Sequence, residues 1–238
     1  MRKATESRVV VVTGAGGGLG RATAKLLTGR GHRVIGIGRR APRVFESRTV
    51  CDEWVQSDLT NLASVEVAAK RVSELASGRI DCLVNNAGVG FHCRVDRIQA
   101  DELEEVFLVN ALAPILLTSR LLAALECTGG LVVNVTSRLV DAEMAFTSVY
   151  TASKRALAGF ARVLRAERGL RVCSIEPGAM ETLFLRHTHD PPVVDSLANR
   201  RLDRLEPKIV ASHIVKVIES RPEVLVERLQ IVPSKQTF

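Results

Sequence analysis

The sequence predicts an α/β fold: one doubly wound parallel sheet of about seven strands, with helices on both faces. Short apolar runs alternate along the chain with longer segments of helical spacing, which is the β-α-β order of parallel sheets. The runs are apolar throughout, as expected of strands covered on both faces. We find no linker within the 238 residues, so the whole chain, 1–238, is expected to form one domain.

Each strand is predicted where β-branched and apolar residues gather between turn residues. The first, RVVVVT, is followed by a run of glycines, and the sixth, RVCSIEPG, is ended by Pro-Gly. The seven segments are 8–13, 33–38, 53–57, 80–88, 130–137, 171–178 and 228–232.

Helical spacing predicts helices over 19–29, 61–77, 99–126, 148–168 and 207–220. Pro114 predicts a kink in the third of them. Residues 179–206 fit neither pattern and contain two consecutive prolines. Compact domains rarely carry so long an irregular stretch, so we interpret it as a lid on the substrate side.

Composition narrows the function classes. No apolar run approaches the ~20 residues of a membrane span, and the N-terminus lacks a signal-peptide pattern, so no membrane partner is expected. The five cysteines are scattered without a C-x-x-C, which favours free thiols in a cytoplasmic protein. Net charge is +7, but the basic residues are interspersed with acids, which argues against a nucleic-acid partner.

A glycine-rich loop, residues 13–20, joins the first strand to the first helix. Its spacing is G-x-x-x-G-x-G, at Gly14, Gly18 and Gly20. Glycines let the backbone approach a phosphate, and the helix N-terminus beyond them attracts anions. The loop therefore predicts a Rossmann-like dinucleotide site, with a merely tight strand–helix turn as the alternative.

The end of the second strand bears on the choice of cofactor. NAD-binding units place an acid about 20 residues after the glycines, where it binds the ribose hydroxyls. Here the chain has Arg39 and Arg40, and no acid before Glu46. Arginines pair with a 2′-phosphate, so NADP(H) is favoured over NAD(H) unless both arginines are simply solvated.

Tyr150 and Lys154 lie four residues apart on a predicted helix, and Ser137 ends the fifth strand. Residues at i and i+4 share one helix face. An ammonium ~4 Å away stabilises a phenolate by roughly 4 kcal/mol before screening, which lowers the tyrosine pKa. The pair therefore indicates an acid/base catalyst. An ordinary amphipathic helix and a serine cap are the alternatives.

Taken together, these motifs resemble the short-chain dehydrogenase/reductase family over nearly the whole chain. Asn85–Gly88 is similar to the family's NNAG, and Pro177, Gly178 and Thr182 to its P-G-x-x-x-T. The resemblance implies the catalytic residues Asn110, Ser137, Tyr150 and Lys154. The expected cofactor-binding residues are Gly14, Gly18, Leu19, Gly20, Arg39, Arg40, Asp58, Leu59, Asn86, Ala87, Gly88, Tyr150, Lys154, Pro177, Gly178 and Thr182.

The resemblance also implies a mechanism. NADPH delivers hydride to a carbonyl, Tyr150 protonates the alkoxide, and Ser137 hydrogen-bonds the same oxygen. Lys154 holds the nicotinamide ribose and lowers the tyrosine pKa, while Asn110 holds a relay water. Homotetramers or homodimers formed through the helices at 99–126 and 148–168 are expected.

The substrate side departs from the common family pattern, because 138–146 is charged and lacks glycine and proline. Arg138, Met144 and Arg94 are the candidate substrate residues, and a small polar substrate is favoured. Further basic residues in and near the lid (Arg186, His187, His189, Arg200, Arg201 and Arg204) suggest an anionic substrate or a solvated basic lid. No metal site is expected. The alternatives are a silent NADP(H)-sensing regulator or scaffold and a sugar-nucleotide epimerase.

Overall fold

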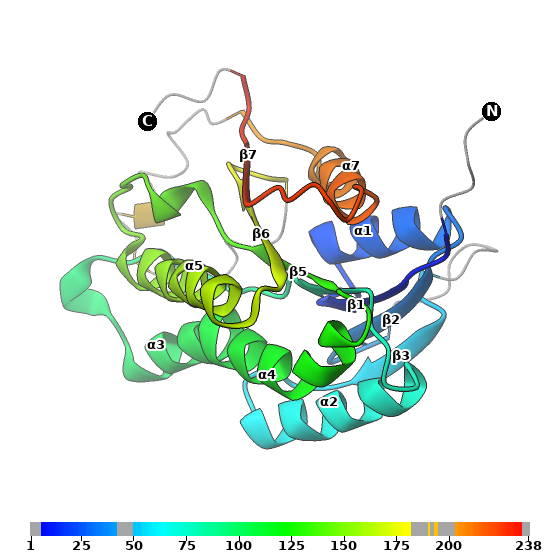
Figure 1. Ribbon diagram of the computed structural model, residues 1–238. Coiled ribbons are helices and arrows are strands. Elements are labelled where there is room, and N and C mark those ends of the chain that lie inside the picture. The colour runs from blue at the N-terminus through cyan, green and yellow to red at the C-terminus, as the bar shows by residue number, and fades with distance from the viewer. Residues whose placement is uncertain (1–5, 42–49, 182–189, 191–192, 195–202, 235–238) are drawn as a thin grey trace.

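A computed structural model describes residues 6–41, 50–181, 190, 193–194 and 203–234. It contains one seven-stranded parallel sheet in the order β3-β2-β1-β4-β5-β6-β7 (Figure 1). The predicted fold class is confirmed. The strands are β1 Val9–Thr13, β2 Arg33–Gly38, β3 Glu53–Gln56, β4 Cys82–Asn85, β5 Leu131–Val135, β6 Arg171–Pro177 and β7 Arg228–Ile231.

Helices cover both faces of the sheet. One face carries α1 (Gly18–Thr28) and α7 (Pro207–Ile218), and the other carries α2 (Leu62–Leu75), α4 (Ala113–Glu126) and α5 (Ser148–Arg168) (Figure 1). Alternate residues of each strand enter the two layers: Val10 and Val12 pack under α1 and α7, and Val11 packs under the other helices. All three are fully buried, which explains why the central strand β1 is apolar at consecutive positions.

The predicted helix 99–126 is divided. It consists of α3 (Ala100–Phe107), a π-helical turn (Leu108–Leu112) and α4. The expected kink at Pro114 is therefore wrong in its position: the irregularity precedes the proline, which lies in the first turn of α4, where its missing N–H is tolerated. Asn110 lies inside the π-helical turn, a feature that is frequent at functional sites.

The same segment corrects a second expectation, namely that no apolar run approaches the length of a membrane span. Ala100–Glu126 is 27 residues long with a mean hydropathy of 1.8 in its most apolar stretch, enough to span a membrane by length and composition alone. Half of that stretch is buried inside the structure. Leu117, Leu121 and Leu125 of α4 are fully or almost fully buried in the core beside α2. Its apolarity thus has a structural explanation.

The two ends of the expected lid, 179–206, lie together. Met180 and Leu205 form a parallel β-bridge, in which Leu205 N–H donates to the Ala179 carbonyl at 2.9 Å and Glu181 N–H to the Leu205 carbonyl at 3.0 Å. Val193 is fully buried. Most of the remaining segment lies outside the described residues, so its function as a lid stays a prediction.

Candidate active site

A cleft of about 980 Å³ lies beyond the carboxyl ends of the strands. Open α/β sheets bind their ligands at this edge. Of the predicted site residues, those that line the cleft are Gly14, Gly18, Leu19, Arg39, Asp58, Leu59, Asn86, Ala87, Gly88, Ser137, Arg138, Met144, Tyr150, Lys154, Pro177 and Gly178. The structure thus brings motifs that are spread over more than 160 residues of sequence to one cleft.

The glycine loop owes its shape to two residues with left-handed backbone. Gly14 has φ +68° and Gly18 has φ +49°, a region that favours glycine. Gly20 has a different function from the one expected. A Cβ on Gly20 would lie 2.3 Å from the Gly14 carbonyl oxygen, so Gly20 lets α1 pack against the loop, and it does not line the cleft.

Thr13 ties this loop to the end of β4. Its hydroxyl oxygen accepts hydrogen bonds from the N–H groups of Asn86 and Ala87, both at 3.0 Å. The Asn86 side chain donates back to the Thr13 carbonyl at 2.8 Å. Sequence reasoning treated Thr13 only as the first residue of the loop, although its position immediately before Gly14 was the available signal.

Arg39 follows β2 and Asp58 follows β3. Both line the end of the cleft that is distant from Tyr150, because β2 and β3 lie in the opposite half of the sheet from β5 and β6. The Asp58 carboxylate accepts hydrogen bonds from the N–H and hydroxyl of Thr60, at 3.0 and 2.9 Å. These bonds, with a smaller contribution from the Arg39 charge, hold the pKa of Asp58 below its usual range. Arg40 is exposed and does not line the cleft, so of the two arginines only Arg39 does.

Ser137 and Tyr150 meet at the opposite end. Ser137 follows β5, and its hydroxyl oxygen accepts the Leu139 N–H at 3.2 Å. Tyr150 lies in the first turn of α5 and is hydrogen-bonded through its side chain to Ser137. Burial raises the pKa of Tyr150 to about 12, and the hydrogen bond with Ser137 lowers it in part. The phenol is therefore protonated at neutral pH.

Lys154 lies next to Tyr150 on the cleft wall. Its ammonium donates to the Val135 carbonyl at 2.9 Å and lies 5.9 Å from the centre of the Tyr150 ring. Burial lowers the pKa of Lys154 to about 8. The expected lowering of the phenol pKa by this ammonium stays a prediction.

Asn110 lies behind the cleft and does not line it. Its side chain is fully buried, accepts from the Val89 N–H at 2.9 Å, and donates to the Val89 carbonyl at 2.8 Å and the Ser153 hydroxyl at 3.0 Å. A Cβ on Gly88 would lie 3.2 Å from both the side-chain oxygen of Asn110 (Oδ1) and the side-chain nitrogen of Lys154 (Nζ). Asn110 and Lys154 thus flank the same glycine.

The substrate end contains acids that the sequence analysis did not name. Glu105 and Glu181 line the cleft with Arg138 and Arg204, so this end has mixed charge instead of a basic character. His92 is buried and also lines it. Their signal in the sequence was weak, because Glu105 lies on a helix and Glu181 follows the Pro-Gly turn.

Arg94 does not line the cleft, which corrects its assignment to the substrate. Its guanidinium pairs with Asp190 at 3.1 Å, linking the loop after β4 to the segment 179–206. Thr182 and the basic residues Arg186, His187, His189, Arg200 and Arg201 lie outside the described residues. Within the described ranges no group of three or more His, Cys, Asp or Glu residues is placed to hold a metal ion.

Comparison with known proteins agrees with this geometry. A family model described as short chain dehydrogenase matches residues 8–191. The chain belongs to the short chain dehydrogenase family. Among curated members, it is 31% identical to the 3-oxoacyl-[acyl-carrier-protein] reductase FabG of Vibrio harveyi over 219 residues, covering 88% of this chain and 89% of that protein. It is 36% identical to Protein FixR of Bradyrhizobium diazoefficiens, covering 83% and 76%.

Solved structures of this family share the whole architecture. An alcohol dehydrogenase from the archaeon Thermococcus sibiricus, complexed with 5-hydroxy-NADP, superposes with a TM-score of 0.85 at 26% identity and covers 98% of this chain and 99% of its own. This short chain dehydrogenase is therefore an oxidoreductase by family, and its cofactor and substrate have to be argued from its own residues.

Proposed function

We propose that this short chain dehydrogenase uses NADP(H) to interconvert a carbonyl group and a secondary alcohol on a small polar substrate. One observation carries the proposal. Tyr150, whose side chain is hydrogen-bonded to Ser137, lines the same cleft as the glycine loop at Gly14 and Gly18. A proton donor and a cradle for a dinucleotide thus share one space of about 980 Å³.

The glycine loop fits a dinucleotide. At Gly14 the backbone is left-handed, and an added Cβ would lie 3.0 Å from the Asn86 side-chain nitrogen and 3.1 Å from the Ala87 Cα. Gly17 and Gly18, at the start of α1, line the cleft and have no side chains to cover the helix N-terminus. Such an N-terminus favours a pyrophosphate.

The preference for NADP(H) rests on Arg39. It follows β2, lines the cleft, and has no acid beside it in sequence that would repel a 2′-phosphate. A relative with a known structure, the Thermococcus sibiricus alcohol dehydrogenase, was solved with 5-hydroxy-NADP. Asp58 also lines the cleft, and we propose that it binds the adenine end of the cofactor.

The acid/base chemistry belongs to Tyr150 and Ser137. NADPH, when bound, supplies the hydride. Tyr150, protonated because burial raises its pKa to about 12, then donates its proton to the developing alkoxide. Ser137 donates a hydrogen bond to the same oxygen and stabilises its charge. Lys154, fixed on the Val135 carbonyl, holds a positive charge beneath the ring.

The substrate is proposed to be polar because charged side chains line its end of the cleft. Arg138 and Arg204 face the same space as Glu105 and Glu181. A purely apolar substrate would displace water from these charged groups, which is unfavourable. We further propose that 179–206 closes over this end, and that the protein works in the cytoplasm.

The proposal includes a homodimer or homotetramer. Leu103, Leu112 and Val163, on α3, the π-helical turn and α5, are exposed by 39%, 44% and 60%. Exposed apolar groups of this kind mark protein interfaces. A single monomer mass by light scattering at micromolar protein would refute this part.

The test of the function begins with thermal melting of the protein alone, with NADPH and with NADH at equal concentrations. Ligand at about 100 times Kd stabilises by about 2.7 kcal/mol, which a melt resolves. A larger shift with NADPH is expected. The loss of NADPH absorbance is then measured with a panel of carbonyl compounds, with and without charged groups. Tyr150→Phe is the inactive control. A silent regulator would show the melting shift and no turnover with any compound.

A further inference from the structure

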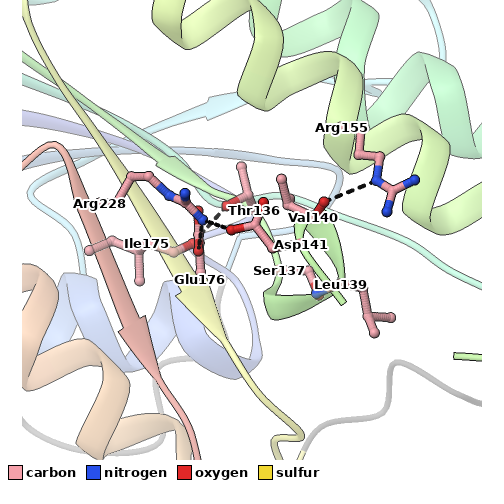
Figure 2. A network of polar contacts seen from close by, with 9 residues as sticks. All are labelled: Thr136, Ser137, Leu139, Val140, Asp141, Arg155, Ile175, Glu176 and Arg228. Atoms are coloured by element: carbon pink, nitrogen blue, oxygen red, sulfur yellow. Dashed lines mark hydrogen bonds and ion pairs between the residues drawn. The ribbon is translucent and has the colours of Figure 1, made fainter. Parts of the chain in front are cut away.

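A buried carboxylate lies beside the cleft and outside the proposed catalytic set. Glu176 is the penultimate residue of β6, and its side chain is 2% exposed. It accepts two hydrogen bonds from Arg228 at the start of β7, one from Nε and one from a terminal guanidinium nitrogen, both at 2.8 Å (Figure 2). Two parallel bonds of this kind fix a guanidinium in one orientation.

The same guanidinium reaches a third element. Arg228 also donates to Asp141, the residue that follows the short helical turn Arg138–Val140 (Figure 2). The carboxylates of Glu176 and Asp141 together raise the pKa of Arg228, Glu176 having the larger effect. Arg228 therefore connects the buried end of β6 to an exposed loop.

That loop carries Ser137 at its other end. The Val140 N–H donates to the Ser137 carbonyl at 3.1 Å, and the Asp141 N–H to the Arg138 carbonyl at 3.2 Å. The segment from Ser137 to Asp141 is thus one hydrogen-bonded turn, so a constraint at Asp141 is transmitted to Ser137.

Two other contacts hold the same turn, one on each side. Before it, the N–H and hydroxyl of Thr136 both donate to the Ile175 carbonyl, at 2.8 and 3.2 Å. Behind it, Arg155 of α5 donates to the Val140 carbonyl at 3.0 Å (Figure 2). The hydrogen bond from Arg228 to Asp141 joins the end of the turn to the sheet.

Stability alone does not account for the Asp141 contact. The side chains of Asp141 and Arg228 are 55% and 51% exposed, and ion pairs at such positions contribute little to folding. Glu176 differs, because a buried carboxylate needs its partner. The pair of Glu176 and Arg228 is therefore a fixed support, and Asp141 is the group attached to it.

We propose that Asp141 and Arg228 are positioning residues, which hold Ser137 against the Tyr150 hydroxyl from a support on Glu176. The inference rests on the proposed function, in which Ser137 and Tyr150 act on the same oxygen. It also links both walls of the substrate end, since Glu176 directly precedes Pro177 and Gly178, which line the cleft.

The test compares Asp141→Ala with Glu66→Ala. Glu66 pairs with Arg120 between α2 and α4, and this pair is similarly exposed, at 42% and 48%, but neither residue lines the cleft. Both variants should melt within about 4 °C of the wild type. Asp141→Ala should lower kcat about 10-fold or more with KM for NADPH unchanged, because small misplacements of reacting groups are costly. Glu66→Ala should change neither.

A second readout needs no substrate. Tyr150 is the only tyrosine, so protein labelled with ¹³C at the tyrosine Cζ gives one resonance that reports on the phenol hydrogen bond. This resonance should shift in Asp141→Ala and keep its wild-type position in Glu66→Ala. In Asp141→Asn, which keeps an acceptor for Arg228, it should lie close to its wild-type position. An unshifted resonance in Asp141→Ala, or a shifted one with wild-type kcat, overturns the proposal. If the wild type turns over no carbonyl compound, the proposed function fails separately, and the resonance still decides whether Asp141 positions Ser137.

Discussion

Lys154 is a buried cation whose energetic cost should be measurable. Its side chain is 3% exposed, and burial lowers its pKa from 10.5 to about 8. At about 1.36 kcal/mol per pKa unit, the folded protein bears a penalty of about 3 kcal/mol when this ammonium is charged. We predict that Lys154→Met removes this penalty.

The penalty has a definite pH dependence. Below pH 8 both the folded and unfolded chains hold the proton, and the full cost is present. Between about pH 8 and 10.5 the unfolded chain still binds the proton that the folded protein has released, so the free energy of unfolding of the wild type rises with pH. Above 10.5 neither state holds it, and the penalty is gone.

The measurement is urea unfolding of wild type and Lys154→Met from about pH 7 to pH 10. Subtracting the two cancels the titrating groups that they share. The difference should move in favour of the wild type by about 2–3 kcal/mol across this range. Loss of the bond to the Val135 carbonyl adds an offset that does not depend on pH. Lys216→Met, at an exposed position on α7, controls for the substitution itself. A difference that stays flat refutes the argument that burial sets this pKa.

Three further changes test the site. Arg39→Ala should weaken NADPH binding about 10-fold or more with little effect on NADH, read from melting shifts, because a charge-assisted contact with a 2′-phosphate is lost; equal losses for both would contradict this. Gly20→Ala should destabilise by about 2–3 kcal/mol, since its Cβ would lie 2.3 Å from the Gly14 carbonyl, whereas Gly17→Ala, with no atom within 4 Å, should cost less than about 1 kcal/mol by thermal unfolding. Tyr150→Phe should abolish turnover and keep the NADPH melting shift; retained turnover would exclude the phenol as the acid.

The fold was predictable because its signals are local and repeated. Each strand is a short apolar run, and the alternation with helices leaves few other topologies. Boundaries were less predictable where tertiary contacts end an element. The segment 80–88 was expected to hold the fourth strand, and it does. The strand ends at Asn85 within it, since the N–H groups of Asn86 and Ala87 donate to the Thr13 hydroxyl of another strand.

Most of the predicted site residues line the cleft, but the sequence did not predict their long-range contacts. Helical spacing puts Tyr150 and Lys154 on one face, but it does not fix where a four-carbon side chain ends. The Lys154 ammonium donates a hydrogen bond to the carbonyl of Val135, 19 residues earlier, and no local sequence pattern predicts that contact. The assignment of Arg94 to the substrate was wrong for the same reason, because its partner Asp190 lies 96 residues away in the sequence.

The topology explains why these distant motifs converge. The chain builds β1, β2 and β3 outward in one direction, then returns to place β4 on the other side of β1 and continues to β7. At the reversal, the loops after β1 and β4 diverge, and ligands bind in the crevice between them. Here Gly14 follows one strand and Asn86 the other, and Thr13 joins the two loops. Hydrogen bonds therefore tie the two loops together across this reversal at the cofactor end, while Arg228, bonded to Glu176 and Asp141, links the sheet to the Ser137 turn at the substrate end.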